Sequence, residues 1–155
     1  MNKDESMLLS LLSEEVSEME RLRALLEAEA EALQGLQADA LLQMVETKAG
    51  LVQALERLGA RRAELLVRIG CASDPPSLKL FMANAPAPIA TAWQALVAET
   101  GRCESLNRRN GALNQSGQRQ VLRLIRVLRG EPVEPPTYGR KGDPGVGGGQ
   151  PLAKA

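Results

Sequence analysis

The first third of the chain carries a heptad pattern of apolar residues. One row repeats every seven positions and a second lies three or four positions from it: Leu12, Met19, Leu26 and Leu33, then Leu8, Leu22 and Leu36. Glu15 and Glu29 interrupt the second row. This spacing places the apolar side chains on one face of a helix, which we expect over residues 3–34. Gly35 is expected to end or bend it.

The same pattern resumes after Gly35 and predicts a second helix over residues 39–69, with Asp39 as its N-cap. Its two rows are Met44, Leu51, Leu58 and Leu65, and Leu41, Leu55 and Ile69. Lys48 and Arg62 take the remaining places of the second row, where we expect their stems to lie on the seam and their charges to point outward. Because only a few residues separate the two helices, they should form an antiparallel hairpin.

Prolines interrupt the helical pattern between residues 70 and 88. The apolar run between them predicts a short helix over residues 77–83, capped by Ser77, which closes the end of the hairpin. A third long helix should then extend over residues 87–129. Its stripe is apolar at both ends and polar or small in the middle: Ile89, Trp93, Leu96, Thr100, Cys103, Asn107, Asn110, Asn114, Gly117, Val121, Leu124 and Leu128.

The polar middle of this stripe weakens the helix, because Asn and Gly are poor helix formers. Two explanations stay open. Polar residues in a helical seam can set register and limit how many helices associate. Alternatively, small and polar residues leave the seam less committed to one partner.

Residues 120–129 (QVLRLIRVLR) are apolar over more than one flank. Val121, Leu124, Ile125 and Leu128 form a stripe, and Leu122 widens it. Such a face is suited to docking a partner helix, although core packing in a longer bundle explains it equally well. From residue 130 onward Gly and Pro dominate, which predicts a disordered tail over residues 130–155.

Composition favours an all-α fold, because β-sheets are rich in aromatic residues and this chain of 155 residues contains only Phe81, Trp93 and Tyr138. We therefore expect one helical domain over residues 1–129. Its hairpin and third helix would form a three-helix, coiled-coil-like bundle, followed by the flexible tail.

Several function classes are disfavoured by the residues present. The chain has no His, and Cys71 and Cys103 are far apart, so we expect no metal site and no cofactor. We find no catalytic constellation or phosphate-binding loop and expect no enzyme. The acidic, amphipathic start is unlike a signal peptide, and no run is apolar for long enough to insert stably in a membrane, which favours a cytoplasmic protein.

Charge is balanced overall but unevenly placed, with an acidic first segment and a basic one over residues 101–130. A nucleic-acid-binding helix built on these arginines is one alternative. The neutral total charge and the lack of aromatic residues for base stacking argue against it, so we expect no nucleic-acid partner. A coiled-coil scaffold or adaptor without a client is the other alternative. Exposed heptad seams are equally compatible with a monomer and with a homo-oligomer.

Beyond these general features, the chain resembles the FlgN family of flagellar export chaperones. The most specific features shared with it are the Asn107-x-x-Asn110-Gly111 element and Tyr138-Gly139-x-x-Gly142. The order of the helices and the basic, apolar run that ends the third helix also agree. The resemblance covers nearly the whole chain, and the glycine-rich end after Gly142 departs from it.

The resemblance implies a cytoplasmic chaperone that binds hook-filament junction (hook-associated) proteins. In that family the chaperone keeps their helical C-terminal ends soluble and unassembled and delivers them to the flagellar type III export gate. The family's C-terminal helix binds the client, and a tyrosine in the C-terminal segment, here Tyr138, is associated with the gate. The client-binding candidates are Asn107, Asn110, Gly111, Leu113, Val121, Leu122, Leu124, Ile125 and Leu128.

This resemblance leads to a hypothesis about the polar middle of the third helix's stripe. The polar middle weakens the packing of the third helix, so that the C-terminal half can detach from the hairpin and coil around a client helix.

Overall fold

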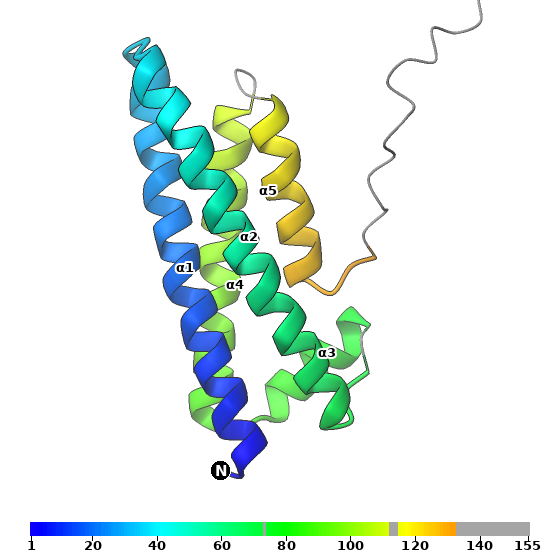
Figure 1. Ribbon diagram of the computed structural model, residues 1–155. Coiled ribbons are helices and arrows are strands. Elements are labelled where there is room, and N and C mark those ends of the chain that lie inside the picture. Colours follow the sequence, from blue (N-terminus) through cyan, green and yellow to red (C-terminus); the bar gives the residue numbers. More distant parts are fainter. Residues whose placement is uncertain (73, 112–114, 133–155) are drawn as a thin grey trace, which may run out of the picture.

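Five helices make up the computed structural model (Figure 1), which describes residues 1–72, 74–111 and 115–132, with backbone only over residues 115–120. The described residues contain no strand, so the all-α prediction is confirmed. α1 (Lys3–Gln34) and α2 (Ala38–Arg68) form the predicted antiparallel hairpin. The predicted tail, from residue 133 on, lies outside the described residues.

The N-terminus of α1 is closed by a capping box. The Asn2 side chain accepts a hydrogen bond from the backbone N–H of Glu5, and the Glu5 carboxylate accepts one from the backbone N–H of Asn2, both at 2.8 Å. At the start of α2 the predicted N-cap is wrong. Gln37 takes the cap position without a side-chain hydrogen bond, and Asp39 lies in the first turn, where its charge suits the helix dipole.

α3 (Pro75–Asn84) is the short helix that crosses the open end of the hairpin. Asp74, rather than the predicted Ser77, caps it, because the Asp74 carboxylate accepts a hydrogen bond from the Ser77 N–H at 2.9 Å. Hydrogen bonding to Ser77 lowers the pKa of Asp74. Pro75 occupies the first helical turn, where its missing N–H removes no helix bond. The helix therefore begins two residues earlier than its apolar run.

The predicted single helix over residues 87–129 is wrong. The chain forms α4 (Ala87–Asn110) and α5 (Gln115–Leu128), and α5 runs back beside α4 and α2 (Figure 1). A continuous helix of that length would be roughly 65 Å long, compared with roughly 48 Å for α1. Its apolar end would project beyond the hairpin into water. Folding back buries that end, and the turn falls where Gly111 follows α4.

The folded-back helix converts the expected three-helix bundle into four packed helices. α1 packs against α2 and α4, and α5 packs against the other sides of α2 and α4. Side chains from all four helices fill the core, which includes Leu8, Leu12, Met19, Leu22, Leu26, Leu55, Ile89, Leu96, Cys103, Val121 and Leu124.

The acidic interruptions of the first heptad pattern are paired inside the bundle. Glu15 and Glu29 on α1 are 0% and 1% exposed, and they face Arg62 and Lys48 on α2, which are 3% and 2% exposed. Arg62 Nε donates to both carboxylate oxygens of Glu15, at 2.8 and 3.1 Å, and Lys48 Nζ forms an ion pair with Glu29. The predicted outward direction of the two cations is therefore wrong. Arg62 and Lys48 stay inside the bundle because their carboxylate partners, Glu15 and Glu29, are buried there.

We predict that Lys48→Met destabilises the fold by about 3–5 kcal/mol, because it leaves Glu29 buried without its cation. The combined Glu29→Leu and Lys48→Met variant should recover most of this loss, since no charge is then buried. Urea unfolding followed by circular dichroism measures both variants. Equal stability of the single and double variants would show that the ion pair does not constrain the packing of α1 on α2.

Candidate partner-binding interface

The apolar stripe of α5 is turned into the bundle. Val121, Leu124, Ile125 and Leu128 are 0–3% exposed. They pack into the groove between α2 and α4. Leu122, by contrast, is 38% exposed and lies on the outer side of the helix. The structure therefore brings five of the sequence-predicted candidates onto one helix, but only one of them faces solvent.

Gly59 allows α5 to approach α2 closely. A Cβ atom on Gly59 would lie 3.7 Å from Glu15 Oε1 on α1, 3.8 Å from Leu128 and 3.9 Å from Val127, all at ordinary van der Waals contact. Any longer side chain would occupy the space that Leu128 and Val127 fill. A glycine inside a leucine-rich heptad helix was the available sequence signal for this contact, and sequence reasoning missed it.

Polar contacts hold the C-terminal end of α5 only weakly. Arg129 Nη2 lies 2.5 Å from Glu104 Oε2 on α4, and Arg108 lies 3.3 Å from the other oxygen of the same carboxylate. The Arg129 side chain is 47% exposed, so water screens this pair and its net contribution is small. Over the described side chains, residues 121–129, the attachment of α5 therefore depends mainly on the burial of its apolar stripe.

Asn110 of α4 serves a different contact, with α1. Asn107 and Asn110 are 1% and 3% exposed. Asn110 Nδ2 donates to the backbone oxygen of Leu26 at 2.8 Å and to Glu29 Oε1 at 3.2 Å, both on α1. Glu29 is also the partner of Lys48, so a buried polar cluster joins three helices. Of the two explanations for the stripe, this geometry favours fixing the register of α4 on α1.

Asn110 and the apolar stripe consequently do not form one surface. α4 packs against α1 through Asn110, whereas α5 packs against α2 and α4. Gly111 is buried at the end of α4, where the chain leaves the helix. Leu113 and Asn114 lie outside the described residues.

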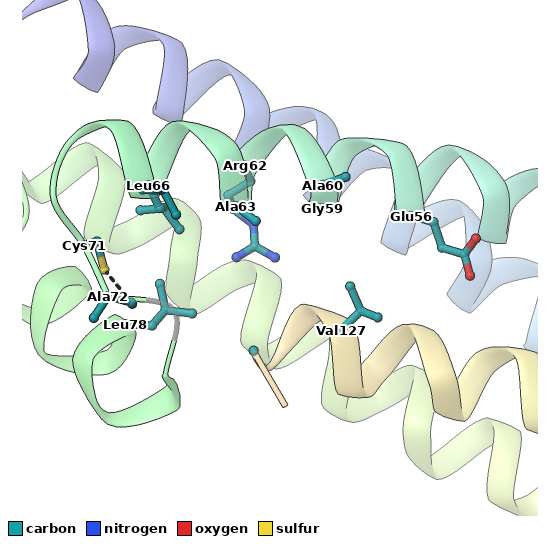
Figure 2. Close-up of a pocket in the computed structure, with 12 residues that line it drawn as sticks. Glu56, Gly59, Ala60, Arg62, Ala63, Leu66, Cys71, Ala72, Leu78 and Val127 are labelled. Carbon is teal, nitrogen blue, oxygen red and sulfur yellow. Dashed lines mark hydrogen bonds between the residues drawn. The ribbon is translucent and has the colours of Figure 1, made fainter. Parts of the chain in front are cut away.

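A cavity of about 150 Å³ lies beyond the C-terminal end of α5 (Figure 2). Its walls come from α2, from Leu78 on α3, and from Val127 and Gly130 at the end of α5. Arg62 also faces it, with its Cζ atom 5.4 Å from the centre of the Trp93 ring on α4. Sequence analysis did not anticipate this cavity, because its walls are brought together only when α5 folds back.

A family model described as FlgN protein matches residues 1–145 of the chain. The chain belongs to the FlgN family. A crystal structure described as a flagella synthesis protein FlgN from Pseudomonas aeruginosa is similar to it, with a TM-score of 0.68 and 28% sequence identity, over 79% of this chain and 95% of that one. No curated protein matches closely enough to count as a relative. Membership of the FlgN family supports a flagellar chaperone role.

The FlgN-family chain offers little for reactive chemistry in the part that the structure describes. No group of three or more potential metal ligands is present among those residues. Burial raises the pKa of the Cys103 thiol to about 12 and also raises that of Cys71. Both thiols are therefore protonated at neutral pH. Among the described helices, none combines the length and apolar character that crossing a membrane requires.

We predict opposite effects for two substitutions of Gly59. Gly59→Ala should stabilise this FlgN-family protein by up to about 1 kcal/mol, because alanine is the better helix former and its Cβ fits. Gly59→Leu should displace α5, because the longer side chain takes the space of Leu128 and Val127, and it also crowds the buried Glu15 carboxylate on α1. Thermal unfolding measures the first effect, and limited proteolysis between α4 and α5 measures the second. Unchanged proteolysis of the leucine variant would contradict the assigned contact.

We also predict that Cys103 resists alkylation in the folded protein, tested in a Cys71→Ser background so that only one thiol reports. The folded pKa of about 12 exceeds the ordinary value of 9.0. The stabilising contribution of this thiol is therefore complete below pH 9.0 and is lost as the pH rises through about 12. Rapid labelling at neutral pH, without prior unfolding, would contradict its burial.

Proposed function

We propose that this protein is a cytoplasmic chaperone of flagellar type III export that binds the C-terminal helical ends of hook-filament junction proteins. It keeps these clients unassembled and delivers them to the export gate. The FlgN family match over residues 1–145 supports the flagellar role. The observation that supports client binding is the apolar face of α5. This short helix packs against α2 and α4 and follows them in the chain as a separate element.

The apolar face of α5 suits a helical client. Val121, Leu124, Ile125 and Leu128 have the spacing by which amphipathic helices associate side by side, and Leu122 extends the face toward solvent. Because the four stripe residues are buried in the free protein, α5 must leave its groove before they can contact a client. The client then covers the stripe in place of α2 and α4.

Opening is energetically accessible because apolar contacts of α5 with the client helix replace its apolar contacts with α2 and α4. Exposing a fully buried aliphatic side chain costs about 1.5–3 kcal/mol, and the cost is offset to the extent that the client helix covers the stripe and the groove that α5 leaves. The Arg129–Glu104 pair adds little resistance, since it is largely exposed. Opening would leave α4 in place, because Asn110 holds its end on α1.

The remaining candidates receive different roles in this proposal. Asn110 keeps the end of α4 on α1, Asn107 is buried one turn earlier in α4, and Gly111 begins the connection that lets α5 move. Client contact by Leu113 stays a prediction, as does contact between Tyr138 and the export gate, since both residues lie outside the described part of the chain.

Pairing of three arginines of the basic segment with carboxylates favours client binding over the nucleic-acid alternative. Arg102 is paired with Glu99 at 2.6 Å, and Arg108 and Arg129 share Glu104. These carboxylates reduce the positive potential that attraction of a phosphate backbone requires. We therefore expect no nucleic-acid binding.

A pull-down from a lysate of flagellated bacteria tests the proposal, with the full chain compared with a chain truncated after Asn114. We expect junction proteins with the full chain and none with the truncated one. Leu122→Asp should weaken binding by about tenfold or more, because an apolar contact worth 1.5–3 kcal/mol is lost and a charge enters the interface.

Leu42→Asp is the matched control, because Leu42 is an exposed leucine on α2, far along the sequence from α5. It should bind clients as well as the parent chain does. Retention of junction proteins by the truncated chain would show that α5 is not the client site. Capture of no flagellar protein by any variant would contradict the chaperone function itself.

A further inference from the structure

The cavity beyond the end of α5 has the size of one small ring. Its apolar walls come from three helices: Ala60, Ala63 and Leu66 on α2, Leu78 on α3, and Val127 on α5. Its volume is about 150 Å³, and apolar cavities of this volume in proteins bind benzene. The cavity therefore suits a ligand of about benzene size, whose body the apolar walls would remove from water.

Arg62 supplies hydrogen-bond donors to this apolar space. The residue is 3% exposed, and Figure 2 shows its guanidinium directed from α2 into the space between α2, Leu78 and Val127. Both of its hydrogen bonds to Glu15 use Nε, and no described residue accepts one from the terminal nitrogens, Nη1 and Nη2. Because donors in an apolar space are stabilised by an acceptor, these nitrogens favour a ligand that carries one.

The charges around the cavity favour an uncharged ligand. Glu15 already neutralises Arg62, at 2.8 Å from Nε, and Glu56 is a further carboxylate in the cavity lining. An anionic ligand would therefore place another negative charge beside two carboxylates. The class of ligand that fits is a small apolar molecule with a neutral acceptor, such as a hydroxyl or carbonyl oxygen.

We propose that the cavity between α2, α3 and the end of α5 is a binding site for a small uncharged molecule of this class. The apolar body of the ligand lies against Ala60, Ala63 and Leu78, and its oxygen accepts hydrogen bonds from the terminal nitrogens of Arg62.

A ligand in this site would hold α5 in its groove. Val127 and Gly130 belong to the cavity wall, so the site is incomplete when α5 is displaced. A ligand that binds only the docked form shifts the equilibrium toward that form by mass action. On the proposed function, on which this last step alone rests, the ligand would oppose client binding.

Benzyl alcohol is a suitable probe, because it combines one ring with one neutral oxygen. We expect it to bind the free full-length protein with a dissociation constant of about 1 mM or tighter. Titration followed by NMR should shift the methyl resonances of Ala60 and Ala63 and the indole resonance of Trp93, which lies beside Arg62. Benzoate should bind more weakly than benzyl alcohol, and tighter binding of benzoate would overturn the uncharged class.

The part played by Arg62 is tested in a variant that removes both members of the buried ion pair, Arg62→Met with Glu15→Leu, so that neither charge is left alone. Benzyl alcohol should bind this variant about tenfold more weakly, because its hydrogen bonds to a charged group are lost. Toluene lacks the oxygen and should bind the variant and the parent chain equally. Equal loss for both probes would show that Arg62 does not recognise the oxygen.

Ala63→Leu fills the cavity from an exposed position on α2 and should abolish binding of benzyl alcohol. Ala24→Leu, at an exposed position on α1, is the matched control and should bind as the parent chain does. Thermal unfolding checks that both variants fold. Absence of binding to the parent chain, or binding that persists in Ala63→Leu, would overturn the site.

Hydrogen exchange tests the link to α5 in the same samples. With benzyl alcohol at about ten times its dissociation constant, amide exchange over residues 121–128 should slow about tenfold. Unchanged exchange in a protein that binds the probe would show that the site does not depend on docked α5. None of these experiments contains a client, so their failure is distinct from failure of the pull-down.

Discussion

The guanidinium of Arg62 is the constraint on which the arrangement of the helices depends. A charge at the centre of a bundle must find its partners there, because removing it from water is costly. Arg62 on α2 is bonded to Glu15 on α1, lies over Trp93 on α4, and faces the cavity at the end of α5. Burial raises the pKa of Glu15 although Arg62 opposes that shift. A slip of α1 against α2 would separate this pair and leave both charges buried without a partner.

Two kinds of attachment divide the bundle into a fixed part and a displaceable part. α1, α2 and α4 are joined by buried polar contacts, including the cluster of Glu29, Lys48 and Asn110, which tolerate little rearrangement. Among its described side chains, α5 is attached by apolar burial and, at its end, by the exposed Arg129–Glu104 ion pair. Apolar contacts are non-directional, so another helix can replace them. This contrast explains how one short helix can exchange partners while its neighbours stay folded.

Heptad periodicity was sufficient to predict the bounds of α1 and the antiparallel hairpin, because both depend on local spacing and a short connection. It was insufficient for α4 and α5, whose stripe continues in register across Gly111. The chain reverses there because the apolar end can be buried only by returning to the hairpin, and the one sequence signal for that contact, Gly59, lies far from the reversal, in α2. Sequence correctly grouped the apolar residues of α5, but it could not show that they are covered, or that Asn110 contacts α1.

Native-state hydrogen exchange of the amides of residues 115–128, compared with those of α4, tests most directly whether α5 opens separately. We expect α5 to exchange through a local opening at a lower free energy than α4, and to become protected when a junction-protein helix is added. Protection of α5 equal to that of the hairpin in the free protein, unchanged by the client, would contradict a displaceable α5.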